Sequence, residues 1–184
     1  MIEVFLLSIG LAMDAFAVSI GIGSKMTTIS LKERLQVAGY FGGFQAIMPL
    51  IGFLAGTGMA GWIGEWDHWI AFLLLLLIGG KMIYEAFHEG VVEALCGLSH
   101  RMLFTLAIAT SIDALAAGFT LPLLDAPAWL SVSTIGVITF ALSYAGIGLG
   151  RKMGTYLEDK AELLGGVILI GIGSKILLEH TGII

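Results

Sequence analysis

Two short stretches of this sequence carry the same acidic core inside otherwise apolar surroundings. Residues 11–19 read LAMDAFAVS and residues 110–118 read TSIDALAAG, which places Asp14 and Asp113 at matching positions. In a helix that crosses a membrane, an ionised aspartate near the bilayer centre costs about 2.5 to 3.5 kcal/mol. This cost predicts a functional role for both carboxylates. The alternative is that each is a protonated or salt-bridged packing residue.

Two carboxylates with neutral oxygens around them indicate the chemistry of a cation site. Such ligands suit a hard or borderline divalent cation such as Mn²⁺, and two negative charges neutralise one dication. Thr110 and Ser111 offer hydroxyl oxygens beside Asp113, although either hydroxyl can instead bond back to its own helix. Gln45, which precedes Pro49 by one turn, is a further candidate ligand, and a hydrogen bond between helices is its alternative role.

The composition is that of an integral membrane protein. Hydrophobic residues make up 58% of the 184 residues and charged residues 12%, with a mean hydropathy of +0.98, whereas soluble domains carry about 25% charged residues. The net charge of −5 and the lack of a basic stripe argue against a nucleic-acid partner. The one cysteine, Cys96, excludes an intramolecular disulfide and a multi-cysteine metal cluster.

Six apolar runs are long enough to cross a bilayer, for which a helix needs about 20 residues. Lipid offers no partner to backbone N–H and C=O groups, so continuous apolar runs of this kind must be helical. The sequence therefore predicts an all-α integral membrane protein with six transmembrane helices in a single membrane domain over residues 1–184. The runs cover residues 2–23, 36–60, 69–87, 102–123, 131–150 and 162–180.

Basic residues and tryptophans predict the orientation of these helices. The connections after the first, third and fifth runs carry the basic residues Lys25, Lys32, Arg34, Arg101, Arg151, Lys152 and Lys160. Positive charge stays on the cytoplasmic side, so both termini are expected outside. The tryptophans flank the other two connections, as an aromatic belt at the outer interface would; they are Trp62, Trp66, Trp69 and Trp129.

The chain also divides into two related halves. A shift of 99 residues aligns Asp14 with Asp113, and a shift of 94 aligns Gly52, Gly56, Gly79, Lys81 and Glu85 with Gly146, Gly150, Gly173, Lys175 and Glu179. Three helices per half is an odd number, so the second half enters the membrane from the opposite side, as in the inverted repeats of many secondary transporters. We expect repeat 1 at about 1–88, repeat 2 at about 101–184, and a short cytoplasmic connection at 89–100.

Two lysine–glutamate pairs occupy matching places in the halves. Lys81 with Glu85, and Lys175 with Glu179, are spaced i, i+4 and share a helix face. One interpretation is structural, because a long cationic side chain near a helix C-terminus can extend to the membrane interface. The other is that Lys81 and Lys175 form inner and outer gates, each pairing with a carboxylate when the metal is absent.

Several motifs along the chain resemble those of one known family. They are MDAFAVSIG, FGGFQAIMPLIGF, DHWIAFLLL, GGKMIYE, ATSIDALAAG and AELLGGVILIGIG. With them the chain resembles the MntP-type bacterial manganese exporters over essentially all 184 residues. The resemblance implies a six-helix inner-membrane protein that exports Mn²⁺ when the metal is in excess, with Asp14 and Asp113 required for transport. In some members an acidic residue stands at the position of Gln45.

No G-x-x-x-x-G-K-[ST] motif for binding phosphate is present, so hydrolysis within this chain cannot drive transport. We therefore expect a secondary transporter, not an enzyme, that needs no cofactor and exchanges its cation for protons across the lipid bilayer. The alternatives are export of another divalent cation, or of a small organic cation or amino acid, and a scaffold or sensor that transports nothing. An intramembrane aspartyl protease is more remote, because neither aspartate lies in a Gly-x-Gly-Asp motif.

Overall fold

The computed structural model describes residues 2–26, 28–63, 67–85, 99–123, 126–153 and 158–180, and all regular secondary structure in these ranges is helical. The α-helices are α1 (Ile2–Lys25), α2 (Leu31–Ile63), α3 (Asp67–Glu85), α4 (His100–Ala109), α5 (Ile112–Gly118), α6 (Ala128–Met153) and α7 (Glu158–His180), and a short 3-10 helix, η1, covers Leu121–Leu123. The all-α prediction is confirmed. Most of the expected connection at 89–100 lies outside the described residues.

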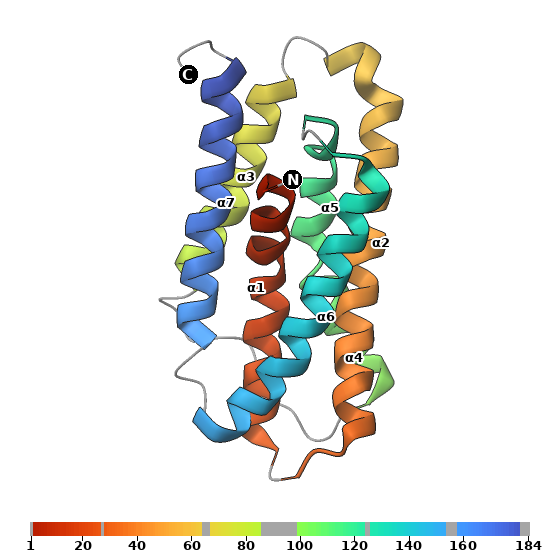
Figure 1. Ribbon diagram of the computed structural model, residues 1–184, viewed down its shortest axis with the longest axis vertical. Coiled ribbons are helices and arrows are strands. Elements are labelled where there is room, and N and C mark those ends of the chain that lie inside the picture. The colour runs from red at the N-terminus through yellow and green to blue at the C-terminus, as the bar shows by residue number, and fades with distance from the viewer. Residues whose placement is uncertain are drawn as a thin grey trace.

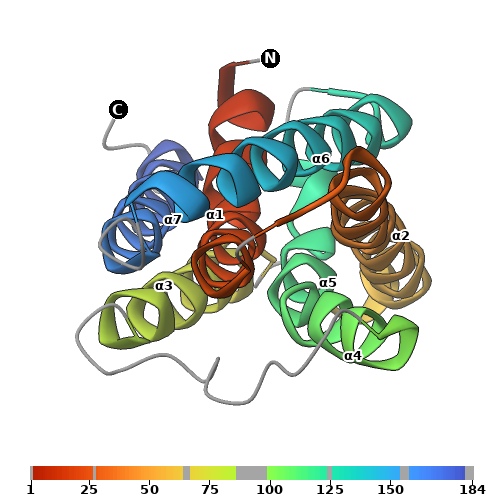
Figure 2. The same ribbon diagram turned by 90° about the horizontal axis from the view of Figure 1, so that it is seen from below.

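Helix α1 lies at the centre of the assembly, and the other helices run roughly along the same long axis around it (Figure 1). It packs against α6 and α7, while α2 packs against α6 and α5, and α3 packs against α7. Seen along the axis, α3 and α7 form one group and α2, α4 and α5 another, with α1 between them and α6 crossing from one group to the other (Figure 2). The central position of α1 explains why Leu7, Leu11 and Ile20 are fully buried.

Among the described residues, three helices are long and apolar enough to span a membrane: α1, α2 over Leu31–Thr57, and α6 over Ala128–Lys152. Helices α4 and α5 make a fourth candidate if they are taken together as one span bent by 40°. Large apolar side chains such as Leu54, Leu77 and Val137 face outward and are exposed. Such a surface suits a lipid environment, where apolar side chains need no cover from the protein.

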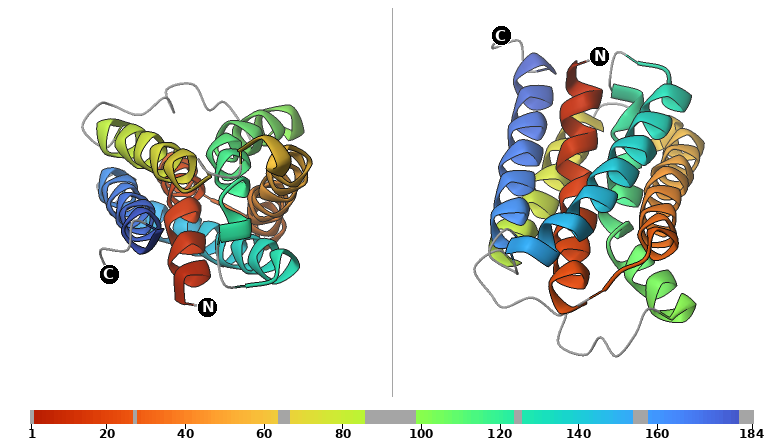
Figure 3. Two further views of the ribbon diagram at one scale, coloured as in Figure 1. Left: turned by 90° about the horizontal axis from the view of Figure 1, so that it is seen from above. Right: turned by 60° about the horizontal axis from the view of Figure 1, so that its bottom comes forward.

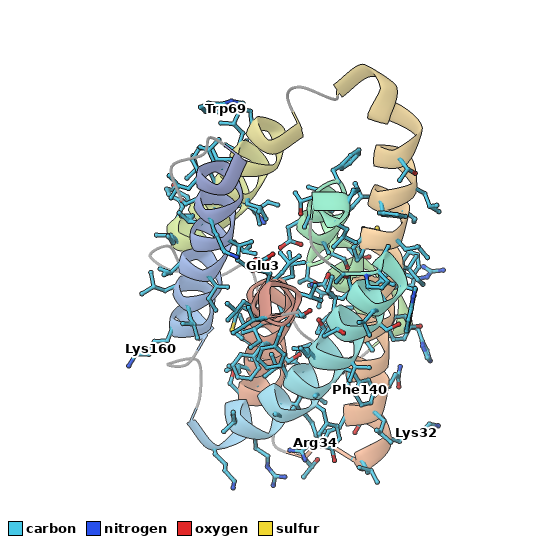
Figure 4. The ribbon with its side chains drawn as sticks, turned by 45° about the horizontal axis from the view of Figure 1, so that its top comes forward. Glu3, Lys32, Arg34, Trp69, Phe140 and Lys160 are labelled. Atoms are coloured by element: carbon cyan, nitrogen blue, oxygen red, sulfur yellow. The ribbon has the colours of Figure 1, made fainter. Side chains whose placement is uncertain are left out.

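Successive helices alternate in direction when α4 and α5 are taken together as one span. The N-terminal ends of α2 and α7 share one end of the assembly, and the N-terminal ends of α3 and α6 share the other (Figures 1 and 3). Lys32, Arg34 and Lys160 lie toward the first end and Trp69 toward the second (Figure 4). These three basic side chains therefore lie toward the opposite end of the long axis from Trp69.

Helix α2 begins at a capping box. The backbone N–H of Ser30 donates to Glu33 Oε2 at 2.7 Å, and the N–H of Glu33 donates to Ser30 Oγ at 3.2 Å. The helix then continues without interruption through Pro49. Because proline has no N–H, the backbone carbonyl of Gln45 loses its helical partner.

The fourth apolar run, predicted as one helix, is broken. Helix α4 ends at Ala109, and α5 begins at Ile112 after a turn at Thr110 and Ser111. The N–H of Ser111 donates to Ile108 O instead of the helical acceptor, Ala107 O. The hydroxyl of Ser111 donates to Ala107 O in its place. The side chain thus supplies the closer donor to a carbonyl that the break deprives of its helical N–H, and Thr110 Oγ1 is a second donor at 3.4 Å.

Glycines bring the backbones of neighbouring helices close together. A Cβ atom on Gly52 of α2 would lie 2.0 Å from the carbonyl oxygen of Leu115 in α5, and one on Gly146 of α6 would lie 3.0 Å from that of Phe16 in α1. Leu115 and Phe16 each follow one of the two aspartates by two residues. The segments that carry the aspartates are therefore each held against a glycine of another helix.

Helices α2 and α6 meet at a second pair of glycines. A Cβ on Gly42 would lie 2.8 Å from Phe140 Cβ and 2.9 Å from Gly136 O. Reciprocally, a Cβ on Gly136 would lie 2.9 Å from Ala46 Cβ and 3.1 Å from Gly42 O. Each residue of the contact on one helix has a counterpart on the other.

Candidate metal site

Asp14 and Asp113 are both buried, on different helices. Asp14 lies in the middle of α1 and Asp113 in the first turn of α5, and they are 8% and 7% exposed. Asp113 Oδ1 accepts a hydrogen bond from the N–H of Ala114 at 2.8 Å. Its second oxygen, Oδ2, is buried and accepts no hydrogen bond. A buried acceptor without a donor is unfavourable by several kcal/mol in an apolar environment, on the order of 2 to 7, so this oxygen is suited to bind a cation or a proton.

The two carboxylates meet inside the assembly. The side chain of Asp113 interacts with that of Asp14 both by hydrogen bonding and through charge, and the charge of Lys81 on α3 also reaches Asp113. Two buried carboxylates that interact directly repel one another unless a proton or a cation lies between them. The structure thus brings together the two acidic side chains that the sequence places at matching positions.

The helices that carry the two aspartates pack mainly on other helices. Helix α1 packs closely on α6, and α5 packs closely on α2. Each aspartate-bearing segment therefore lies against a glycine of another helix, and the two carboxylates reach toward one another from separate pairs of helices.

Two of the predicted supporting ligands, Thr110 and Ser111, use their hydroxyl protons within their own helical segment. Thr110 Oγ1 donates to Leu106 O at 3.0 Å, and Ser111 Oγ donates to Ala107 O. This is the alternative arrangement considered for both residues. A hydroxyl that donates its proton still has lone pairs with which to accept a bond or coordinate a cation.

Gln45 contacts the helix that carries Asp14. Its side chain is fully buried, and Nε2 donates to Leu11 O of α1 at 2.6 Å, one turn before Asp14. The Oε1 atom is buried and accepts no hydrogen bond. The hydrogen bond between helices is therefore present, and it leaves an amide oxygen available near the aspartates.

Lys175 pairs with a residue from α1. Its Nζ atom forms an ion pair with Glu3 Oε1, and the two side chains are 46% and 21% exposed. The side chains of Glu85 and Glu179 lie outside the described part of the structure, so the predicted pairs of Lys81 with Glu85 and Lys175 with Glu179 lie outside it as well. Glu3 lies in the first turn of α1 (Figure 4).

Two further buried oxygens were not predicted from the sequence. Thr139 and Ser143 of α6 are fully buried, and neither hydroxyl oxygen has a hydrogen-bond partner. The shift of 94 residues that aligns Lys81 with Lys175 also aligns Gln45 with Thr139, and this was the signal that could have identified Thr139. Within the described ranges no three or more His, Cys, Asp or Glu side chains gather in one place, so any cation here would need neutral ligands beside the two carboxylates.

Comparison with known proteins identifies related sequences. The family described as "Mntp: Putative manganese efflux pump" matches residues 28–177. "Putative manganese efflux pump MntP" of Saccharophagus degradans is 54% identical over 177 residues, which cover 96% of this chain and 98% of the relative. "Putative manganese efflux pump MntP 1" of Wolinella succinogenes is 53% identical over 180 residues, covering 98% of each. The relative of the same description in Methanosarcina mazei is 48% identical over 176 residues, covering 96% of this chain and 95% of its own length.

No solved structure matches the chain. The relatives align with nearly its whole length, and the family match covers well over half of it. Their names describe transporters, in agreement with the prediction that the chain is not an enzyme. Because it also carries several helices apolar enough to span a membrane, the chain is a multi-pass membrane protein that belongs to the Mntp family.

Proposed function

We propose that this chain is a secondary transporter that exports Mn²⁺ from the cytoplasm across the bacterial inner membrane, with Asp14 and Asp113 as its metal site. The observation that carries the proposal is the meeting of these two buried carboxylates from different helices. One dication between them neutralises both charges, which makes its passage through a low-dielectric region tolerable. The names of the relatives support manganese as the dication.

Six spans in two inverted repeats are the architecture we infer. Helices α1, α2 and α3 form repeat 1 within about 1–88, and α4 with α5, α6 and α7 form repeat 2 within about 101–184, joined at 89–100 on the cytoplasmic side. The matched contacts support this arrangement: Gly52 lies against Leu115 as Gly146 lies against Phe16, and Gly42 lies against its own counterpart, Gly136. Reciprocal contact between equivalent residues is what a pseudo-twofold axis produces.

Both termini are on the outer side in this proposal. The separation of Lys32, Arg34 and Lys160 from Trp69 along the long axis supports that orientation (Figure 4), because basic residues favour the cytoplasmic side and tryptophans the interfaces. Trp129, at the start of α6, is exposed as well. The carboxylates then lie between the two interfaces, where transporters with inverted repeats bind their ions.

Exchange for protons supplies the energy for export. Moving a dication outward against an inside-negative potential requires about 4.6 kcal/mol per 100 mV, at about 2.3 kcal/mol for each elementary charge. Asp14 and Asp113 would bind Mn²⁺ from the cytoplasm, release it outside and return protonated, so that no uncompensated charge crosses the membrane. The hydrogen bond between the two side chains supports a protonated return state.

Two lysines act as gates in this cycle. The ion pair between Lys175 and Glu3 joins α7 to α1 toward the outer end of the assembly. Lys81 of α3 reaches Asp113 through its charge, so it compensates the carboxylate when the metal has left. Opening toward the outside would separate Lys175 from Glu3, and arrival of a cytoplasmic dication would displace Lys81 from Asp113.

The metal content of cells tests the proposed site. Wild type, Asp14→Asn and Asp113→Asn are expressed in a strain without its own Mn²⁺ exporter, and Ser19→Ala serves as a buried control on α1. Asparagine keeps the size of the side chain and removes its charge. If the bound dication offsets the cost of about 2.5 to 3.5 kcal/mol for each ionised aspartate, the loss of that interaction should lower export roughly a hundredfold or more. Unchanged Mn²⁺ export by both aspartate variants would rule out the site, and export of a different cation by wild type would favour the alternatives.

The coupling is tested separately with purified protein in liposomes. An imposed pH gradient, acidic outside, is expected to accelerate Mn²⁺ export, and each transported ion is expected to return protons that a trapped dye reports. Transport that is indifferent to the gradient would remove proton exchange from the proposal and leave the metal site in place.

A further inference from the structure

Apart from Asp14, four side chains in the described part of the chain have a buried polar atom without a hydrogen-bond partner. They are Gln45 Oε1, Asp113 Oδ2, Thr139 Oγ1 and Ser143 Oγ. All four atoms are oxygens, and they come from α2, α5 and α6. An oxygen that accepts no hydrogen bond can coordinate a hard cation, so all four atoms are suited to the same kind of ligand.

The two hydroxyls of α6 differ from others on the same helix. Ser133 Oγ donates to Trp129 O at 2.7 Å, and Thr134 Oγ1 donates to Leu130 O at 2.8 Å. This bond to the preceding turn is the usual solution for serine and threonine inside a helix. Thr139 and Ser143, which are more deeply buried, do not use it, so their oxygens are arranged for some other partner.

Contacts between α6 and α1 place these hydroxyls near Asp14. Gly146 lies against Phe16 and Gly150 against Ile20, so the two helices run in the same direction. Ser143 precedes Gly146 by about one turn on the same helix face, and it is therefore level with Asp14. The spacing of Thr139, Ser143, Gly146 and Gly150 keeps all four on the face that meets α1.

Thr139 lies one turn further toward the outer end. This is the level of Leu11, the residue whose carbonyl oxygen accepts the amide of Gln45. Thr139 and Gln45 are also equivalent under the shift of 94 residues. The two repeat-related positions therefore present oxygens to the same turn of α1 from α6 and α2.

We infer that Thr139 and Ser143 are oxygen ligands of the transported dication, an inference that rests on the function proposed above. With the amide oxygen of Gln45 and the carboxylates of Asp14 and Asp113, they supply three neutral and two acidic groups. Mn²⁺ prefers about six oxygen ligands in an octahedral arrangement, whereas Zn²⁺ and Cu²⁺ favour nitrogen and sulfur. The hydroxyls thus favour binding of Mn²⁺ over softer metals.

The test measures Mn²⁺ binding by the full-length protein in lipid nanodiscs, from the electron paramagnetic resonance signal of the free ion. The double variant Thr139→Val, Ser143→Ala removes both hydroxyls with little change in volume. We expect the Kd for Mn²⁺ to rise roughly tenfold or more, the range seen when groups that support a metal site are removed, and the Kd for Zn²⁺ to change less. The matched control, Ser133→Ala with Thr134→Val, removes hydroxyls of the same helix that bond to their own backbone and is expected to bind as wild type.

Two single variants separate ligation from packing. Thr139→Ser keeps the hydroxyl and is expected to bind Mn²⁺ as wild type, whereas Thr139→Val keeps the shape and is expected to bind more weakly. Equal affinity of these two variants, or wild-type affinity of the double variant while Asp113→Asn loses binding, would overturn the inference and leave the proposed function intact. Wild-type binding by Asp113→Asn would instead remove the aspartate site and this inference with it.

Discussion

Asp14 and Asp113 occupy matching positions in the two halves, but the helices that carry them differ. Helix α1 runs unbroken past Asp14, whereas the matching segment breaks into α4 and α5 just before Asp113. Helix α1 also packs extensively on α6 and α7, while α5 packs mainly on α2 and makes few contacts with α3. One aspartate therefore lies on a well-packed central helix and the other on a short helix with fewer neighbours.

The difference has a local cause in the sequence. The residues that match Thr110 and Ser111 after a shift of 99 are Leu11 and Ala12, which have no hydroxyl. Without a side chain to satisfy Ala107 O, a break at this depth would leave a buried carbonyl without a donor. Elements with few packing contacts open at lower free energy than the core. We therefore expect α4 and α5 to move during transport and α1 to serve as the fixed element.

The largest effect is expected from two glycine substitutions, which test whether the two aspartate-bearing segments are held equally tightly by their neighbours. A Cβ on Gly52 would lie 2.0 Å from Leu115 O, and one on Gly150 would lie 2.0 Å from Ile20 O. Because backbone atoms cannot rotate away, Gly52→Ala and Gly150→Ala should each lower the free energy of unfolding by about 3 kcal/mol, the upper end for overpacking. Thermal unfolding of the purified protein in detergent measures this.

Gly43→Ala and Gly171→Ala are the controls, because a Cβ at either position would have no heavy atom within 4 Å. They should unfold at the wild-type temperature or slightly above it. If Gly52→Ala proves mild and Gly150→Ala severe, α5 yields where α1 does not, which sharpens the contrast between the halves. If both are as mild as the controls, neither glycine is needed to hold its aspartate-bearing segment in place.

The helical fold was predictable because lipid leaves continuous apolar runs only one conformation. The break at Thr110 and Ser111 was not, because hydroxyls inside a helix usually bond to the preceding turn without interrupting it. What distinguishes Ser111 is the backbone bond to Ile108 O, which leaves Ala107 O to the side chain. Which carbonyl the Ser111 N–H bonds to depends on how the following segment packs against α2, and residue spacing does not predict that packing.

Among the site residues, charge made the difference between what was predicted and what was not. Asp14 and Asp113 stand out in an apolar run because an ionised group there is so unfavourable. Thr139 and Ser143 do not stand out, because a neutral hydroxyl can satisfy itself within its helix, and only the tertiary structure shows that these two do not. Likewise the ion pair of Lys175 with Glu3, which lies 172 residues away along the chain, could not be predicted from spacing within one helix.

A smaller effect compares one buried hydroxyl in each half. Ser111→Ala removes the closer donor of Ala107 O and leaves Thr110 Oγ1 at 3.4 Å, so it should lower the free energy of unfolding by about 1 kcal/mol. Ser19 of α1 is equally buried, but its hydroxyl donates to Ala15 O, which already accepts a helical bond. Ser19→Ala should therefore change the free energy of unfolding by about 0.5 kcal/mol or less. Equal losses in urea or thermal unfolding would contradict a special role for the hydroxyl at the break, and amide exchange across residues 106–115 should accelerate only in Ser111→Ala.

The smallest effect concerns the ion pair of Lys175 with Glu3, which joins α7 to α1. The residue that matches Glu3 after a shift of 99 is Met102, which carries no charge, so the equivalent ion pair of Lys81 cannot form at that position. Because both groups are partly exposed, Glu3→Gln and Lys175→Met should each lower the free energy of unfolding by less than about 1 kcal/mol. If this ion pair acts as the outer gate, weakening it by that amount changes the ratio of closed to open protein by about fivefold at most.

The rate of Mn²⁺ export from liposomes should therefore change by up to this factor, with an unchanged Kd for Mn²⁺. An unchanged rate in both variants would make the pair structural, and the contrast between the halves would then depend on the break alone.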